Sequence, residues 1–217
     1  MVLLERRRAG PRVLAAGVNQ CPPGRAPAGN IIPAVGSEFG QPQTAPPRCT
    51  RLESMIQRVV AQCTLIDRAV ELVGRISGPV LELGLGNGRT YDHLRNRFQE
   101  REVFVFDREL ASHPDSRPDA PHFIQGDFRE TLPKALAIIG SGAAVAHCDV
   151  GSHDAQASRA LAATIAPLLG ALMTHGGIVL ADQPMSHPEF RALPLPDDLE
   201  PLSYFAYRVD KLAVDRP

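Results

Sequence analysis

The chain has 217 residues, of which 44% are hydrophobic and 22% charged, values typical of a globular protein with a buried core. Its formal net charge of -1 gives no global field that would attract nucleic acid or an anionic membrane, so we expect neither as a partner. No apolar run approaches the roughly 20 residues that a membrane-spanning helix needs. The four cysteines lack CxxC spacing, which argues against a zinc site or disulfide framework and favours a reducing, cytoplasmic location: Cys21, Cys49, Cys63 and Cys148.

The composition changes near residue 50. Residues 1–50 contain eight prolines and six glycines without sustained apolar periodicity, so they cannot bury enough surface to offset the entropy of ordering them. Arginines followed by the apolar patch Val13–Val18 suggest an export signal or an organelle presequence, but this patch is shorter than the apolar core of a signal peptide. We therefore expect a disordered leader over 1–50, or a start codon placed too far upstream, and one folded domain over 51–217.

The folded part is expected to begin with an amphipathic helix, because apolar residues recur at steps of three and four from Leu52 to Val73. Five short apolar runs bounded by turn residues then predict strands at 79–84, 102–107, 121–127, 143–150 and 176–182. Helices are predicted between them at 87–98, 131–140 and 154–173. Thr131 would cap the second of these, and Pro167 would kink or break the third. The alternating run 203–210 predicts a late strand that closes an edge of the sheet.

Strands that alternate with helices over short connections predict an α/β fold with a doubly wound, mostly parallel sheet. Ligands of such sheets bind past the carboxyl ends of the strands, near the point where the strand order reverses. Most of the predicted ends carry a carboxylate, and they are Glu82–Gly88, Asp107, Gly126–Phe128, Asp149–His153 and Asp182. The sequence therefore predicts the functional site at this edge of the sheet.

The loop after the first strand, in the run VLELGLGNGRTY, has the pattern G-x-G-x-G. A dinucleotide fingerprint would need glycine where Arg89 stands, which argues against a nicotinamide-dependent oxidoreductase. The Gly-Lys-Ser/Thr ending of a nucleotide-binding Walker loop is also absent. Glu82 precedes the loop and would repel a pyrophosphate, so the loop suits a ligand with a positive end.

The same run resembles the first motif of class I S-adenosylmethionine-dependent methyltransferases, E/D-x-G-x-G-x-G, and is similar to a small bacterial group among them whose substrate is unassigned. The resemblance extends from Glu82 to Asp182. It implies a Rossmann-like methyltransferase fold with an antiparallel edge strand, and S-adenosylmethionine as the cofactor. Glycines would let the backbone pass close to this ligand. The helix that opens near Asn87 would offer free N–H groups to its carboxylate.

Individual residues would then contact separate parts of the cofactor. Glu82 would face its ammonium or sulfonium end, directly or through water, and Asp107 would accept hydrogen bonds from both ribose hydroxyls. The resemblance implies an adenine pocket at Gly126-Asp127-Phe128 and places Asp149 nearest the reacting methyl group. The predicted cofactor-binding residues are Glu82, Gly84, Leu85, Gly86, Asn87, Gly88, Asp107, Arg108, Gly126, Asp127, Phe128 and Asp149.

Methyl transfer is an in-line displacement in which the protein mainly aligns the reactants and excludes water. A general base is needed only for a protonated acceptor, and the candidate catalytic residues are Asp149 and His153. Asp149, Asp182 and Gln183 lie where cation-dependent O-methyltransferases carry two aspartates and an asparagine, but Gln183 departs from that pattern and we expect no metal site.

The acceptor is expected to be a small molecule. The chain lacks the N/D-P-P-Y/F tetrapeptide of methyltransferases that act on planar amino groups, and it lacks a basic stripe with interleaved aromatics. A non-catalytic protein that binds S-adenosylmethionine or S-adenosylhomocysteine, and a subunit that acts only in a complex, stay open at this point, as does a homodimer.

Overall fold

The computed structural model describes residues 49–140, 142–197, 199 and 204–211. The chain divides between Cys49 and Thr50 into two units, and the described helices and strands all belong to the second. The leader predicted over 1–50 lies outside the described residues except for its last two positions.

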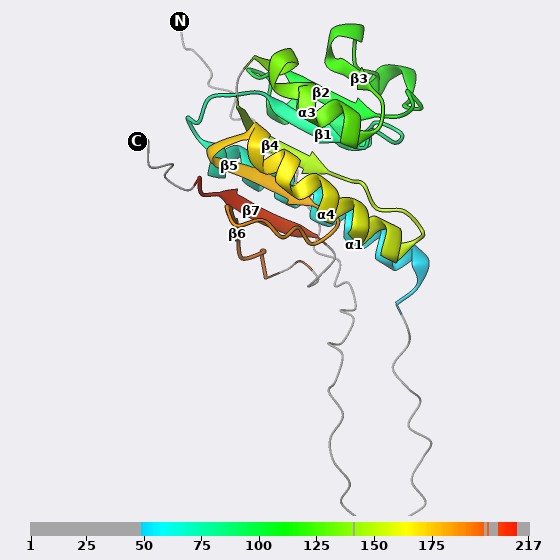
Figure 1. Ribbon diagram of the computed structural model, residues 1–217. Helices are drawn as coiled ribbons and strands as arrows, with labels where there is room; N and C mark the ends of the chain where they lie inside the picture. Colours follow the sequence, from blue (N-terminus) through cyan, green and yellow to red (C-terminus); the bar gives the residue numbers. More distant parts are fainter. Residues whose placement is uncertain (1–48, 141, 198, 200–203, 212–217) are drawn as a thin grey trace, which may run out of the picture. The chain divides into compact units, whose positions relative to one another are not determined.

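The described strands form one sheet in the order β3-β2-β1-β4-β5-β7-β6 (Figure 1). Five strands run parallel, and β7 is antiparallel to both of its neighbours, which confirms the predicted mostly parallel, doubly wound sheet. The strands are β1 (Val80–Leu83), β2 (Val103–Asp107), β3 (Phe123–Gln125), β4 (Ala143–Cys148), β5 (Met173–Ala181), β6 (Phe190–Ala192) and β7 (Phe205–Val209).

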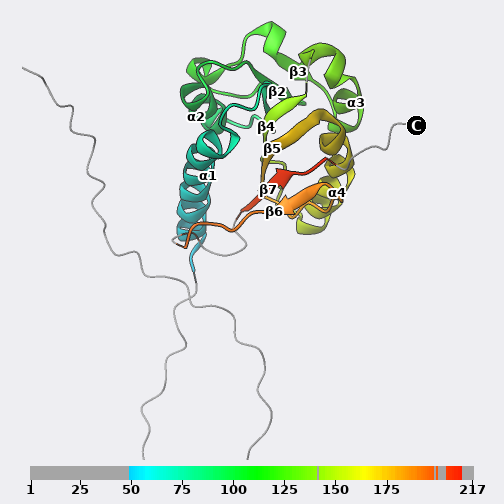
Figure 2. The ribbon, with the colours of Figure 1, turned by 90° about the vertical axis from the view of Figure 1, so that its left-hand side faces the viewer.

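Helices cover both faces of this sheet (Figure 2). Helices α1 (Arg51–Val73) and α2 (Arg89–Arg97) lie on one face, and α3 (Phe128–Ile139) and α4 (Ala155–Leu172) lie on the other. Each pair packs its apolar side against the strands and forms a separate buried cluster. Two short 3-10 helices, η1 (Pro114–Ser116) and η2 (Ala120–His122), lie between β2 and β3.

Helix α1 begins with a capping box, in which the Thr50 hydroxyl accepts from the Glu53 N–H and the Glu53 carboxylate accepts from the Thr50 N–H. Its apolar periodicity is as predicted, but only its later turns bury the stripe. Leu65 and Ile66 are fully buried, whereas Leu52 is 66% exposed. The first turns of α1 therefore extend past the core, toward the carboxyl ends of the strands.

Three local predictions need correction. Asp127, not Thr131, caps α3, because its carboxylate accepts from the Arg129 N–H at 2.9 Å, and the helix starts three residues earlier. Helix α4 runs without a break through Pro167, since its face on both sides of the proline is buried against the sheet. The late strand β7 is not outermost, because the short strand β6, too short to show alternation, pairs with its outer edge.

Candidate active site

The glycine loop joins β1 to α2 in a conformation that needs glycine. Gly84 has φ of +90°, and a Cβ there would lie 2.1 Å from the backbone oxygen of Asp149. Gly86 has φ of +49°, and a Cβ there would have nothing within 4 Å. The loop is thus pressed against the end of β4 at its first glycine and open to a ligand at its second.

Asp107 ends β2 and holds this loop in place. Its Oδ2 accepts from the backbone N–H of Leu85 at 2.6 Å and of Gly86 at 3.3 Å, and its Oδ1 accepts from the Glu109 N–H at 3.2 Å. Gly126 also lies here, because its N–H donates to the Asp107 carbonyl at 2.9 Å. The first and third predicted strand ends are therefore bonded directly to the second.

Asp127 and Arg108 form an ion pair of 2.7 Å at the outer side of the site. The Arg129 N–H at the start of α3 and the Arg108 guanidinium hold the pKa of the Asp127 carboxyl below its ordinary value, against the smaller effect of burial. Phe128 follows as the first residue of α3 and is half-buried.

A cavity of about 450 Å³ joins these predicted residues. It opens between the strand ends and the starts of α3 and α4, and most of the predicted cofactor residues outside the loop tip border it. Its lining is Gly84, Gly86, Asp107, Arg108, Phe128, Arg129, Asp149, Val150, Gly151, Ser152, Ala157, Ser158 and Leu161.

A second cavity, of about 370 Å³, lies on the other side of the glycine loop, between the loop and α1. It shares Gly84, Gly86, Asp149 and Gly151 with the first cavity. Its remaining lining residues come from the first turns of α1 and from the loop and the start of α2: Met55, Arg58, Val59, Gln62, Leu85, Asn87, Arg89 and Thr90. The two cavities thus meet at the ends of β1 and β4.

Arg58 and Gln62 were not predicted from the sequence, yet both reach the strand ends from α1. The Arg58 guanidinium forms an ion pair with Asp149 and contacts Asp182 at 3.3 Å, and Gln62 Nε2 donates to Asp149 Oδ2 at 2.9 Å. Burial opposes the charge of Arg58, but the two aspartates outweigh it and raise its pKa. Their spacing of four residues, which puts them on one helix face, was the available signal.

Asp182 follows β5 and binds the backbone of the loop after β4. Its carboxylate accepts from the Val150 N–H at 3.2 Å and the Gly151 N–H at 2.8 Å, so it shapes the loop after β4. Burial and the nearby Asp149 raise its pKa. Within the described residues, no group of three or more His, Cys, Asp or Glu side chains is placed to hold a metal ion.

Glu82 is fully buried and lines neither cavity. Its carboxylate accepts from the Thr90 hydroxyl and lies 2.7 Å from His147 Nδ1, and His147 Nε2 lies 2.5 Å from the Tyr204 hydroxyl. We call these four residues the Glu82 network. His147 stands beside Glu82 in the register of β4 on β1, which the sequence did not reveal because the strand order was not known.

The Glu82 network has shifted pKa values. Burial raises the pKa of Glu82, although His147 and Thr90 oppose it. Burial lowers the pKa of His147, but the Glu82 carboxylate outweighs this effect and the net shift is upward. Burial also raises the pKa of Tyr204 well above its ordinary value. The network therefore retains protons more strongly than the same groups in water.

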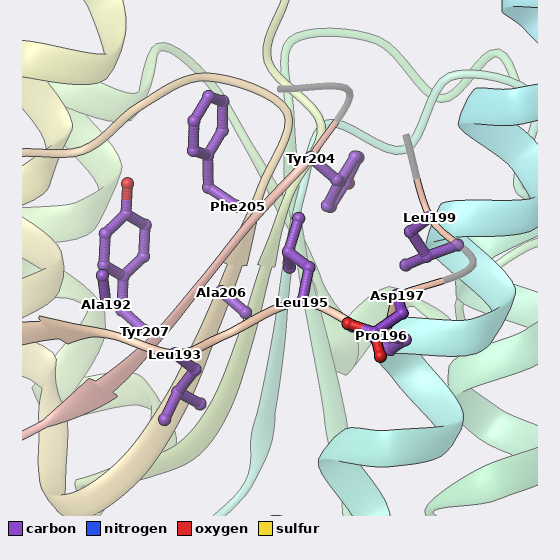
Figure 3. A pocket seen from close by; sticks show the side chains of 10 residues that line it. All are labelled: Ala192, Leu193, Leu195, Pro196, Asp197, Leu199, Tyr204, Phe205, Ala206 and Tyr207. Carbon is purple, nitrogen blue, oxygen red and sulfur yellow. The ribbon is translucent and has the colours of Figure 1, made fainter. Parts of the chain in front are cut away.

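A third cavity, of about 460 Å³, lies between β7 and residues 193–197 and 199 (Figure 3). Apolar side chains dominate it, and the leucines Leu193, Leu195 and Leu199 lie along one side of it in Figure 3. Tyr204 is the residue that this cavity shares with the Glu82 network.

His153, the second predicted catalytic residue, is exposed in the turn before α4 and lines neither cavity at the strand ends. Leu85, Asn87, Gly88 and the other loop residues stand where the glycine pattern predicted them, between β1 and α2. None of the described helices is both long and apolar enough to cross a membrane.

Comparison with known proteins defines the class of this protein. A family model described as S-adenosyl-L-methionine methyltransferase matches residues 49–209. The chain belongs to this family, and it is an S-adenosylmethionine-dependent methyltransferase. No curated protein matches the chain in sequence.

A solved structure agrees with this assignment. The chain is similar to the S-adenosyl-L-methionine methyl transferase from Silicibacter pomeroyi DSS-3, with 41% identity and a TM-score of 0.71 over 74% of this chain and 98% of that one. The family match and this structure confirm the predicted class, fold and cofactor. A more distant match is the apo structure of CalS11, a TDP-rhamnose 3'-O-methyltransferase of calicheamicin biosynthesis, with 18% identity and a TM-score of 0.49 over 74% and 81% of the chains.

Proposed function

We propose that the chain transfers the methyl group of S-adenosylmethionine to a small-molecule acceptor with an oxygen or nitrogen nucleophile. The observation that carries this proposal is the pair of cavities that meet at the ends of β1 and β4. Each volume lies within the range of small-molecule sites. Of the predicted adenosine-binding residues, Asp107 and Phe128 border the first cavity. The second cavity continues between the glycine loop and α1, where the methionine end of the cofactor and the acceptor would meet.

The side chains of the first cavity fit the adenosine part of the cofactor. Asp107 already accepts three backbone hydrogen bonds, but a carboxylate has about four acceptor positions, and the bonds to Gly86 and Glu109 are long. Its oxygens can therefore accept from the ribose hydroxyls after a small adjustment of the loop. Phe128 and Leu161 offer apolar surface to the adenine ring in the same cavity.

The bound cofactor supplies an electrophilic methyl group on a sulfonium, so the chain itself has to align the acceptor and exclude water. Met55 and Val59 form an apolar wall of the second cavity opposite the glycine loop. Asp149 borders both cavities and is the better placed of the two candidate bases, whereas His153 would have to act from the rim. We propose no metal ion for the reaction.

The test is transfer of labelled methyl from S-adenosylmethionine by the full-length chain to a panel of small hydroxyl and amine compounds, with nucleic acid and protein mixtures in parallel. We expect label on one class of small molecule, and loss of that activity in Asp107→Ala. Asp115→Ala is the matched control, because Asp115 is 90% exposed at its side chain and lines neither cavity.

Label on nucleic acid or protein and on no small molecule would contradict the proposed acceptor class. Two further proposals, a homodimer and a cytoplasmic location, are tested by light scattering of the purified chain and by cell fractionation.

A further inference from the structure

Arg58 lines the second cavity and pairs with Asp149, which borders both cavities, and folding stability alone does not explain this position. Its guanidinium uses Nη2 for both Asp149 and Asp182, and no bond of Nε or Nη1 is found among the described residues. Its side chain is 40% exposed, and that of Asp149 is 26% exposed. An ion pair with this much solvent contact contributes little to folding stability.

The methionine end of the cofactor is a zwitterion with one ammonium and one carboxylate. The second cavity offers one charge of each sign to such a group, Arg58 and Asp149, both beside the glycine loop. Arg89 also lines this cavity but stands on α2 and is exposed. Gln62, one turn after Arg58, donates to the Asp149 oxygen that Arg58 does not contact.

We propose that Arg58 exchanges partners when the cofactor binds, so that its guanidinium binds the methionine carboxylate and Asp149 binds the ammonium. Asp182 keeps its two backbone partners in both states, and Gln62 keeps Asp149 in position. With its carboxylate bound to the ammonium, Asp149 no longer serves as the base considered above; the inference otherwise concerns the cofactor alone and holds for any acceptor.

The exchange is balanced in charge. Breaking the Arg58–Asp149 pair leaves one positive and one negative group, and the zwitterion supplies a partner of opposite sign for each. Asp182 gives up its 3.3 Å contact with Arg58 and keeps the N–H groups of Val150 and Gly151. A planar guanidinium can bind a carboxylate through two parallel hydrogen bonds, from Nε with Nη2 or from Nη1 with Nη2, and both of these edges become available once Nη2 of Arg58 leaves Asp149. A ligand without the amino-acid end would leave the original ion pair intact.

Three ligands separate these contacts in calorimetric titrations of the full-length chain. S-adenosylmethionine carries both charges, decarboxylated S-adenosylmethionine carries only the ammonium, and 5'-methylthioadenosine carries neither. We expect Arg58→Gln to weaken the binding of S-adenosylmethionine by about 10- to 100-fold, because one charged hydrogen-bonded contact is lost. The same variant should bind 5'-methylthioadenosine within about twofold of wild type. It should bind decarboxylated S-adenosylmethionine at least as tightly as wild type does, because the ammonium no longer competes with Arg58 for Asp149.

Asp149→Asn gives the complementary pattern. It should weaken the binding of both S-adenosylmethionine and its decarboxylated form and leave the affinity for 5'-methylthioadenosine unchanged. Arg58→Lys should lose less affinity for S-adenosylmethionine than Arg58→Gln, because it keeps the charge. Arg51→Gln is the matched control on the same helix, since Arg51 is exposed and lines neither cavity, and it should bind all three ligands normally.

Equal losses for all three ligands in Arg58→Gln would overturn the proposal, because they would mean that Arg58 only shapes the site. Unchanged binding of S-adenosylmethionine in this variant would overturn it as well. Circular dichroism of each variant before titration ensures that the compared chains are folded.

Discussion

Tyr204→Phe gives the most direct test of the Glu82 network. Tyr204 is fully buried, with an exposed fraction of 0%, and its hydroxyl lies 2.5 Å from His147 Nε2. Phenylalanine keeps the ring and its packing in the apolar cluster of α1 and α2, so the change removes one hydroxyl and little else. His147 would then keep Glu82 at Nδ1 but lose its partner at Nε2.

The expected loss of stability follows from the buried ionisable pair Glu82–His147, to which the Tyr204 hydroxyl is hydrogen-bonded. A hydrogen bond to a charged group contributes about 1.5–3 kcal/mol, against about 0.5–1.5 kcal/mol for a neutral one. For a folded unit of this size, about 1 kcal/mol corresponds to about 2–4 °C in Tm. We therefore expect Tyr204→Phe to lower Tm by about 3–12 °C, measured by calorimetry, with a lower urea midpoint and an unchanged m-value.

Tyr207→Phe is the matched control for this measurement. Tyr207 is also buried in β7, but its hydroxyl accepts from the backbone N–H of Met185 at 2.9 Å, a neutral contact. Its loss should cost about 0.5–1.5 kcal/mol. If Tyr204→Phe destabilises the chain no more than Tyr207→Phe does, the reasoning that the buried Glu82–His147 pair strengthens the hydrogen bond of Tyr204 is wrong.

Two further predictions concern pH and the glycine loop. The pKa of His147 in the folded protein is raised above 6.5, so its contribution to stability is complete below pH 6.5 and is lost as the pH rises through the folded value. In urea unfolding at pH 6 to 8, the free energy of unfolding of wild type should fall by up to about 1.4 kcal/mol per pH unit relative to that of His147→Gln. If the two free energies of unfolding change with pH in parallel, the pKa of His147 is not shifted. Gly84→Ala should destabilise the chain more than Gly86→Ala, because both suffer backbone strain of about 1–3 kcal/mol but only the first Cβ meets the Asp149 carbonyl; equal urea midpoints would contradict that close approach.

Much of the fold could be predicted because its signals are local. Each buried strand of the parallel part is a short apolar run ended by turn residues, and each run is followed by a carboxylate or a glycine at the functional edge. The rules of parallel sheets predicted that these ends meet at one edge of the sheet, although they did not give the order of the strands. Strand β6 was missed because a segment of three residues close to prolines is too short to show the alternation of apolar and polar residues that predicts a strand.

The α1 contribution to the site could not be predicted in the same way. Arg58 and Gln62 appear in the sequence as polar positions on an amphipathic helix, a pattern that any surface helix shows. Their partners Asp149 and Asp182 follow 87 to 124 residues later. Only the packing of α1 across the strand ends brings these side chains together, and that packing depends on the whole apolar face of the helix.

Glu82 and Asp149 illustrate why residue type and strand position do not determine a role. Both are acids near the ends of neighbouring strands, and both were expected at the cofactor. The Glu82 side chain is completely buried, and its two carboxylate oxygens contact Thr90 and His147. The Asp149 side chain is 26% exposed and borders both cavities. A buried carboxylate with both oxygens occupied holds secondary structure together, here the start of α2 against β1 and β4. A partly exposed one can change partners at small cost, because water already shares in its solvation. The difference in exposure, which no sequence pattern encodes, therefore separates the acid that holds the start of α2 against the sheet from the acid that can meet a ligand.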